Sequence, residues 1–283
     1  MILMMAAPAV AMAAEPAATL KERSYAHHLI ERAMASHPAV AAMIVHAAPS
    51  GQKAAVIVAS TQGRLGEAAG AEDLEVIASG RPKVSEGAGA RLTIIEPLKD
   101  VAGEVIGALD VVYGEKAGGD RKARLAEAAE IRDRMALRIA HANNLSDPWP
   151  YDPAFSDGTF AQRLVDRTLA RHPEVLILAV HATPPGSNTD VILGSNIGRI
   201  GKKADEDDLR VIDTGAVNRE VNGRRFEAEV PLNDAGGKRI GALGVVFHYS
   251  DGADKEALVK RAEAIRDEMA REIASPAALV RKL

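Results

Sequence analysis

The chain has 283 residues, which is enough for two domains of ordinary size. Its formal net charge of −4 argues against a nucleic-acid-binding protein, which normally presents a basic face, and no run of like charges marks a tail. It has no cysteine, which excludes disulfides, thiolate metal sites, covalent haem attachment and a cysteine nucleophile. We therefore expect no nucleic-acid partner, and we predict neither a cofactor nor a metal site.

The N-terminus is apolar over residues 1–14 and becomes polar at Glu15. Ala11-Met12-Ala13 fits the small-x-small pattern of a cleavage site, and the run is too short to cross a bilayer as a helix. No Lys or Arg precedes it, which indicates that the true start codon lies upstream. We predict a signal peptide over residues 1–14 and an exported, soluble periplasmic protein without a membrane span. The alternative is a disordered alanine-rich leader on a cytosolic protein.

The strongest feature of the sequence is an internal repeat. Residues 37–80 align with residues 172–215 at an offset of 135, and nearly half of the positions are identical. After the loss of one residue, an offset of 134 holds through two hairpins with the pattern PL.D..G..IGAL.VV, centred on Gly103 and Gly237. Because the period exceeds 130 residues, the repeat indicates a duplicated domain and excludes a solenoid.

Each copy predicts the same order of elements: a helix, two strands, a short helix, three strands and a closing helix. The first helix of each copy ends at His-Pro, since the residue before proline is disfavoured in the α conformation. The short helices should end at Gly80 and Gly215, in the position of a C-terminal cap. The predicted ranges are helices 20–36 and 160–171 and strands 40–47, 54–60, 91–98, 105–113, 175–182, 190–194, 224–232 and 239–249.

These patterns predict an α+β fold with two domains, each a central antiparallel sheet of about five strands with flanking helices. We place the first domain at residues 19–142 and the second at residues 158–275. Residues 143–157 contain three prolines within Asp147–Pro153 and are expected to form a stiff, extended connector. Residues 276–283 are expected to form a C-terminal tail.

The order of elements, the GR[LI]G…DL.VI..G segment and the repeated hairpin together resemble Cache domains, the extracytoplasmic PAS-like sensor modules of bacteria. The resemblance covers both halves of the chain. It implies a PAS/Cache-like fold and a small-molecule ligand bound over the sheet. Cache domains usually belong to membrane receptors, whereas this sequence shows neither a transmembrane helix after the sensor nor an output domain.

Arg64 and Arg199 occupy equivalent glycine-flanked loops and are our first candidates for ligand binding. Glycines let a ligand approach the backbone closely, and arginine can bind a carboxylate or phosphate with two hydrogen bonds. The alternative is that each arginine pairs with an acidic residue, such as Asp73 or Asp208, and fixes its loop.

His46 and His181 lie near the ends of equivalent strands and are candidate ligand contacts, because a neutral imidazole both donates and accepts hydrogen bonds. The alternative is a structural hydrogen bond. His37 and His172 precede proline and are expected to act at helix ends.

Asp110 interrupts an apolar strand at a position where the second copy has Gly244. A carboxylate on a sheet face is costly unless it is paired or faces water. Asp110 is therefore predicted either to receive an amine-bearing ligand or to face solvent at a sheet edge.

The sequence contains no nucleophile elbow, no H-E-x-x-H motif, no P-loop and no dinucleotide fingerprint. We therefore expect a non-enzymatic protein that binds a small polar or anionic solute and passes the signal to a membrane-bound signalling or transport partner. The alternative is a non-catalytic interaction or scaffold module of the cell envelope with degenerate pockets.

Overall fold

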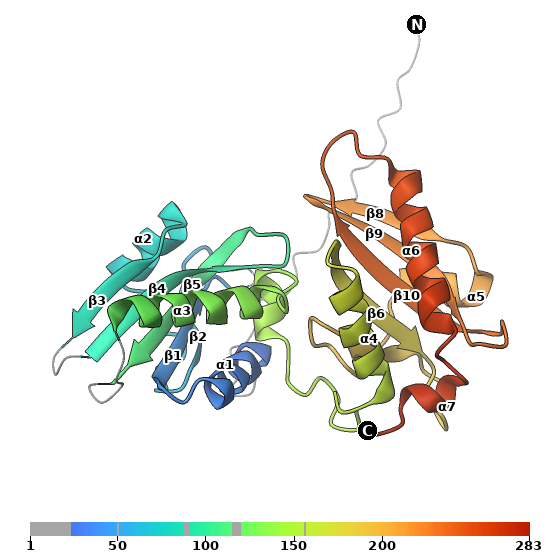
Figure 1. Ribbon diagram of the computed structural model, residues 1–283, viewed down its shortest axis with the longest axis horizontal. Helices are drawn as coiled ribbons and strands as arrows, with labels where there is room; N and C mark the ends of the chain where they lie inside the picture. Colours follow the sequence, from blue (N-terminus) through green and yellow to red (C-terminus); the bar gives the residue numbers. More distant parts are fainter. Residues whose placement is uncertain (1–23, 50, 88–90, 115–119, 156) are drawn as a thin grey trace, which may run out of the picture.

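The computed structural model of the protein describes residues 24–49, 51–87, 91–114, 120–155 and 157–283. It contains two separate five-stranded antiparallel sheets with flanking helices (Figure 1). Their strand orders, β2-β1-β5-β4-β3 and β7-β6-β10-β9-β8, give both sheets the same topology. The predicted α+β duplication is thus confirmed. The predicted signal peptide, residues 1–14, lies outside the described residues.

The first domain follows the predicted order of helix, two strands, short helix, three strands and helix. Its elements are α1 (Tyr25–Ser36), β1 (Val40–Ala47), β2 (Val56–Ser60), α2 (Ala71–Ser79), β3 (Lys83–Gly87), β4 (Arg91–Lys99), β5 (Val105–Tyr113) and α3 (Arg121–Ala136).

The second domain repeats this order and adds a terminal turn of helix. Its elements are α4 (Phe160–Arg171), β6 (Val175–Ala182), β7 (Val191–Ser195), α5 (Glu206–Thr214), β8 (Asn218–Asn222), β9 (Arg225–Asn233), β10 (Arg239–His248), α6 (Lys255–Ala270) and α7 (Pro276–Leu279).

Local signals set the ends of the short helices. Gly80 and Gly215 adopt the left-handed conformation at the C-caps of α2 and α5, as predicted. At the other end, Asp73 and Asp208 each accept a hydrogen bond from the backbone N–H of the N-cap residue. Each short helix therefore places one acidic residue, three positions after its N-cap, at a fixed height above the sheet.

Two details of these elements were not predicted from the sequence. Within the described residues α1 begins at Tyr25, where the Ser24 side chain caps it by accepting a hydrogen bond from the His27 N–H, and residues 20–23 of the predicted helix lie outside the described ranges. Three strands were predicted after each short helix, but the first of them, β3 or β8, had no predicted residue range. Both are polar edge strands without apolar alternation, so the pattern of the sequence did not mark their ranges.

The two faces of each sheet have different roles. One face is covered by the two long helices and carries the main apolar core, which includes Leu109 and Ile131 in the first domain and Phe226 and Ile265 in the second. Because strand side chains alternate, the intervening residues point to the opposite face, over which α2 or α5 lies. That second face carries the polar clusters described below.

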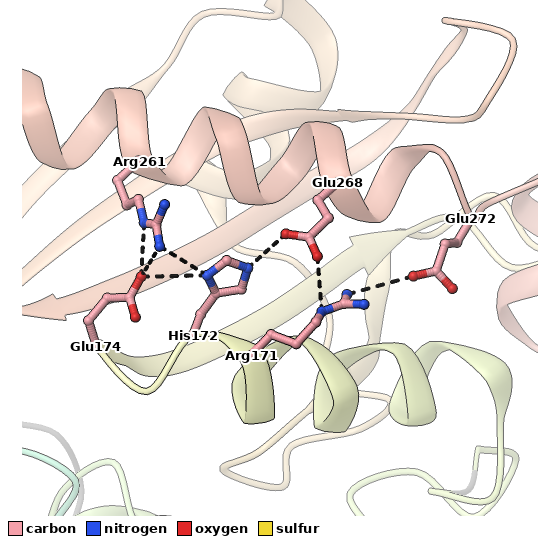
Figure 2. A network of polar contacts seen from close by, with 6 residues as sticks. All are labelled: Arg171, His172, Glu174, Arg261, Glu268 and Glu272. Atoms are coloured by element: carbon pink, nitrogen blue, oxygen red, sulfur yellow. Dashed lines mark hydrogen bonds and ion pairs between the residues drawn. The ribbon is translucent and has the colours of Figure 1, made fainter.

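The predicted helix-end role of the His-Pro histidines agrees with their contacts. His172 Nε2 lies 2.8 Å from Glu268 Oε2 on α6, while Nδ1 lies 3.2 Å from Arg261 and 3.5 Å from Glu174 (Figure 2). In the first domain His37 Nδ1 lies 3.2 Å from Glu127 on α3. Each histidine thus joins the end of one long helix to the other.

The proline-rich segment is not a uniformly extended connector. It begins in a 3-10 helix, η1 (Ala142–Ser146), and Leu145 is completely buried in the core of the first domain. Trp149 stacks on His28 at a centroid distance of 4.0 Å. The segment is therefore packed on the first domain, which prevents it from acting as a free spacer.

The C-terminal residues also pack on their own domain. Leu279 of α7 is fully buried in the second core, and the Phe160 N–H donates to the Arg281 carbonyl at 2.9 Å. Residues of the expected tail therefore pack against the N-terminal end of α4.

The loop between β7 and α5 packs against the first domain. Asn196 donates to the Leu137 carbonyl at 2.9 Å, and Tyr25 Oη lies 3.4 Å from the Asn196 carbonyl. A Cβ atom at Gly198 would lie 2.6 Å from the Tyr25 ring, so only glycine fits there without displacement. The equivalent loop of the first domain has no such neighbour at Gly63.

Leu145→Ala tests whether the connector belongs to the first core. Removing this buried side chain should lower the free energy of unfolding by about 2–4 kcal/mol, because a cavity remains. The control is Leu137→Ala, since the Leu137 side chain is 65% exposed and its loss should change stability by no more than about 0.5 kcal/mol. Urea denaturation of the full chain measures both. Equal effects would contradict the packed arrangement.

Candidate functional site

A histidine and two carboxylates converge on the α2 face of the first sheet. His46 on β1, Asp73 on α2 and Asp110 on β5 are 4%, 7% and 8% exposed. His46 Nε2 lies 3.4 Å from Asp110 Oδ2 and 3.6 Å from Asp73 Oδ2. Burial and the neighbouring Asp110 carboxylate raise the pKa of Asp73 above its ordinary value. Two of the predicted site residues, His46 and Asp110, are therefore brought together, and Asp110 is buried away from the sheet edge.

The second domain builds a related cluster from other strands. His181 Nδ1 lies 3.1 Å from Asp208 Oδ2, although the two are not aligned for a hydrogen bond. Glu229 on β9 is 7% exposed and accepts a long hydrogen bond from Asn218. The histidine and the helix-borne aspartate are thus retained, while the third acid has changed position.

That change is an exchange within one cross-strand pair. In the first sheet Asp110 on the central strand lies opposite Ile95, and in the second Gly244 lies opposite Glu229. Residues opposite each other in such a pair have Cβ atoms about 5 Å apart. Each domain therefore keeps one carboxylate at this point of the sheet and supplies it from a different strand.

The second domain adds a further acid, Glu227, where the first domain has Thr93. A Cβ atom on Gly244 would lie 3.3 Å from Glu227 Oε1, so the glycine leaves room for this carboxylate. Burial and the Glu220 carboxylate raise the pKa of Glu227 to about 7. Among the described residues, the structure gives the Glu227 side chain neither a hydrogen bond nor an ion pair.

Glu227 and His181 line a cavity of about 250 Å³ on this face of the second sheet. Its floor includes Ile177 and Val246, and Ala140 and His141 from the end of the first domain close one side. The polar and charged side chains around it are His141, His181, Arg199, Lys202, Lys203, Asp205, Asp207, Asp208, Asn218, Glu220, Asn222, Arg225, Glu227 and Glu229.

Asp208 and Glu229 both line the cavity, and each shifts the pKa of the other. Burial, followed by the hydrogen bond and charge of Asp208, raises the pKa of Glu229 to about 9. Although burial opposes ionisation of Asp208, its contacts with His181 and Glu229 hold the pKa of Asp208 at about 2. At neutral pH, Glu229 is therefore a protonated donor beside an ionised Asp208.

The two candidate arginines have unequal surroundings. Both adopt positive φ angles, 66° for Arg64 and 65° for Arg199, which are uncommon for residues other than glycine. The Arg64 side chain is 51% exposed and pairs at 3.7 Å with Glu67. Arg199 lines the cavity but donates to Asp147 at 2.7 Å. Both pair with acids, yet neither with Asp73 or Asp208.

Arg199 also fixes the side of the cavity formed by the first domain. Its guanidinium lies 3.3 Å from His141 Nε2. Burial, Arg199 and Arg225 lower the pKa of His141, so the ring is neutral and can accept from the guanidinium. Arg225 is paired with Asp100 of the first domain. These cations hold the two domains together at the rim, which leaves them less free to bind an anion.

The sequence analysis did not identify Glu227 and Glu229 as site residues. The signal was present, since the two acids alternate with the buried Phe226, Ala228 and Val230 along a single strand. In such a strand the apolar side chains point to one face of the sheet and the acidic side chains to the other. When helices cover both faces, this alternation indicates a polar cavity on the acidic face.

A larger cavity of about 680 Å³ lies elsewhere, between α1, α3 and α4. It is lined mainly by apolar residues and arginines, and none of the five predicted site residues borders it. We therefore take the smaller cavity, where titratable groups converge, as the candidate site.

No protein-family model matches the sequence, and no curated protein is significantly similar to it. Among solved structures, a GAF domain of A. aeolicus nlh2 is 15% identical, with a TM-score of 0.32 over 39% of this chain and 82% of that one. Pseudomonas aeruginosa PelD bound to c-di-GMP is 14% identical, with a TM-score of 0.28 over 86% and 75% of the two chains.

An extracellular ligand-binding receptor from Desulfohalobium retbaense is 11% identical, with a TM-score of 0.26 over 79% of this chain and 33% of the receptor. The similar structures thus include a GAF sensor domain and a ligand-binding receptor. With TM-scores below 0.5, they identify neither a family nor a ligand for this chain, and the Cache resemblance stays a prediction.

The elevated pKa of Glu229 predicts a pH-dependent stability. Because the folded state keeps this proton up to about pH 9 and the unfolded state releases it near 4.5, stability should fall as pH rises between these values. The slope is at most about 1.4 kcal/mol per pH unit for one proton. Glu229→Gln should flatten the decline between pH 6 and 9, measured by urea denaturation of the full chain. Glu31→Gln, at an exposed position, should keep the wild-type slope.

The space that Gly244 leaves for the Glu227 carboxylate predicts a coupling between positions 244 and 227. Gly244→Asp should destabilise the protein by about 1–3 kcal/mol, because it buries a carboxylate beside Glu227. Adding Glu227→Thr, the residue found in the first domain, should restore most of this loss. A double-mutant cycle in urea gives the coupling free energy, and additive effects would show that the two positions do not share one space.

Proposed function

We propose that the protein is a non-catalytic sensor-like protein that binds a small polar solute in the cavity of its second domain. The observation that carries this proposal is Glu227, a half-buried carboxylate that faces a cavity with no partner among the described residues. A group in this position is costly unless a ligand or water satisfies it.

The charge around the cavity supports a solute with groups of both signs. Lys202 and Lys203 line it, and their ammonium groups form neither hydrogen bonds nor ion pairs within the described part of the chain. An amine or other donor on the solute would bind Glu227, and an anionic group would bind the lysines. Since 250 Å³ is below the roughly 300–1,000 Å³ of drug-sized sites, the solute is small.

In our proposal, only the second domain binds the solute. On the corresponding face of the first domain, Val76 of α2 packs against Ile95 and Ala108 of the sheet. Ile95 occupies the position of Glu229, so an apolar contact stands where the second domain has its acid. The first domain would then support the binding domain, whose cavity it helps to close through Ala140 and His141.

We further propose that the protein is exported and passes the binding signal to a membrane-bound partner. This part rests on the N-terminal leader and on the Cache resemblance. None of the helices in the described residues is long and apolar enough to cross a bilayer.

One observation favours the alternative of an interaction module. Leu137 is 65% exposed and borders the 680 Å³ cavity between α1, α3 and α4, where a partner could cover it. A partner protein that co-purifies in stoichiometric amount and is lost on Leu137→Asp would support that function.

Dye-reported melting of the full chain against amino acids, amines and hydroxy- and dicarboxylic acids tests the binding function. We expect one class to raise Tm. Glu227→Gln should weaken its binding at least tenfold, about 1.4 kcal/mol, because a charged hydrogen bond is lost. Glu31→Gln is the control and should bind as the wild type does. The proposal fails if no compound shifts Tm or if Glu227→Gln leaves every shift intact.

A further inference from the structure

The cluster in the first domain differs in character from the cavity of the second. His46, Asp73 and Asp110 come from β1, α2 and β5, and one ligand atom of each lies within 4.8 Å of the others. Their side chains are only 5%, 11% and 12% exposed. The set contains one imidazole and two carboxylates, which is a donor set typical of first-row divalent metal ions.

The spacing of these atoms is informative. A charged hydrogen bond between an imidazolium and a carboxylate is expected at about 2.7–2.9 Å. The observed separations from His46 Nε2 are longer, 3.4 Å to Asp110 Oδ2 and 3.6 Å to Asp73 Oδ2. Two ligands bound tetrahedrally to one ion at about 2.0–2.2 Å lie roughly 3.3–3.6 Å apart. The contact of His46 with Asp110 is a long hydrogen bond, and both separations match those of ligands that share one ion.

Two buried atoms of the cluster lack hydrogen-bond partners in the described structure. They are Asp110 Oδ1 and His46 Nδ1. The Asp110 carboxylate points into the cluster, since its other oxygen, Oδ2, lies 3.4 Å from His46 Nε2. A buried carboxylate oxygen without a donor is costly, and a cation or a water bound to a cation would satisfy it.

Comparison with the second domain shows what the first domain lacks. There Asn218 donates to Glu229, and two lysines line the adjacent cavity. The first domain has Val84 in place of Asn218, and Glu67 and Ala68 in place of the lysines. His46 is the only basic side chain that the structure shows in contact with the Asp73 and Asp110 carboxylates in the described ranges.

We propose that His46, Asp73 and Asp110 form a binding site for a first-row divalent metal ion, with Zn²⁺ or Mn²⁺ as the best-fitting candidates. The ion would link β1, α2 and β5 and thereby fix the short helix on the sheet. Water would complete the coordination, since the protein supplies three ligands. This site is independent of the solute cavity of the second domain.

The test uses the full chain, stripped with a chelator and titrated with Zn²⁺, Mn²⁺ and, as a spectroscopic probe, Co²⁺. We expect a Zn²⁺ or Mn²⁺ site that raises Tm, and a visible d–d absorption for Co²⁺. His46→Gln and the nearly isosteric Asp110→Asn should each weaken binding at least tenfold. The matched control is His181→Gln, the same change at the equivalent position of the second domain, which should leave this affinity unchanged.

Circular dichroism shows whether each variant is folded, and the wild-type titration does not depend on any variant. The proposal is overturned if the wild type binds none of the three ions. It is also overturned if His181→Gln weakens binding while folded His46→Gln does not, because the ion would then lie in the second domain. Unchanged affinity in folded Asp110→Asn would likewise overturn it.

Discussion

The burial of neighbouring carboxylates on one face of a sheet is the constraint on which the rest of this structure depends. A buried carboxylate is stable only when a proton, a cation or a hydrogen-bond donor compensates it. Asp73 and Asp208 cannot leave this face, because each caps the N-terminus of its short helix and fixes that helix over the sheet. Any second acid nearby must therefore be compensated by a proton, a cation or a hydrogen-bond donor. Which of these compensates it determines what this face of the sheet can bind.

The two domains compensate their buried carboxylates in different ways. In the second domain, Glu229 stays protonated beside Asp208, and the space left by Gly244 is occupied by Glu227. In the first domain the acid lies on the central strand, and both His46 and Asp73 face it. Duplication thus preserved a histidine and a helix-borne aspartate while the third group moved across one strand pair. The wider polar cavity of the second domain and the tight three-residue cluster of the first reflect this shift together with the replacement of Thr93 by Glu227.

Local signals allowed much of the fold to be predicted from the sequence. His-Pro ended the first helix of each domain, Gly80 and Gly215 ended the short helices, and the repeat required two equivalent sheets. The convergence of His46 with Asp110 was not predictable in the same way, because it depends on the order of strands in space. The acidic partner of Arg199 could not be identified from the sequence, which offered Asp208 as one example, because Asp147 reaches the arginine from the connector between the domains.

The packing of the two domains against each other also explains why the equivalent loops around Arg64 and Arg199 have different surroundings. The loop that contains Arg199 packs on Tyr25 and the connector, so its glycines and its strained arginine serve the contact between the domains. The same conformation at Arg64 faces solvent. Because Ala140 and His141 then border the cavity, the shape of the second domain's site depends on how the first domain is held. A solute bound at Glu227 would in this way be coupled to the contact between the two copies, which a single domain could not provide.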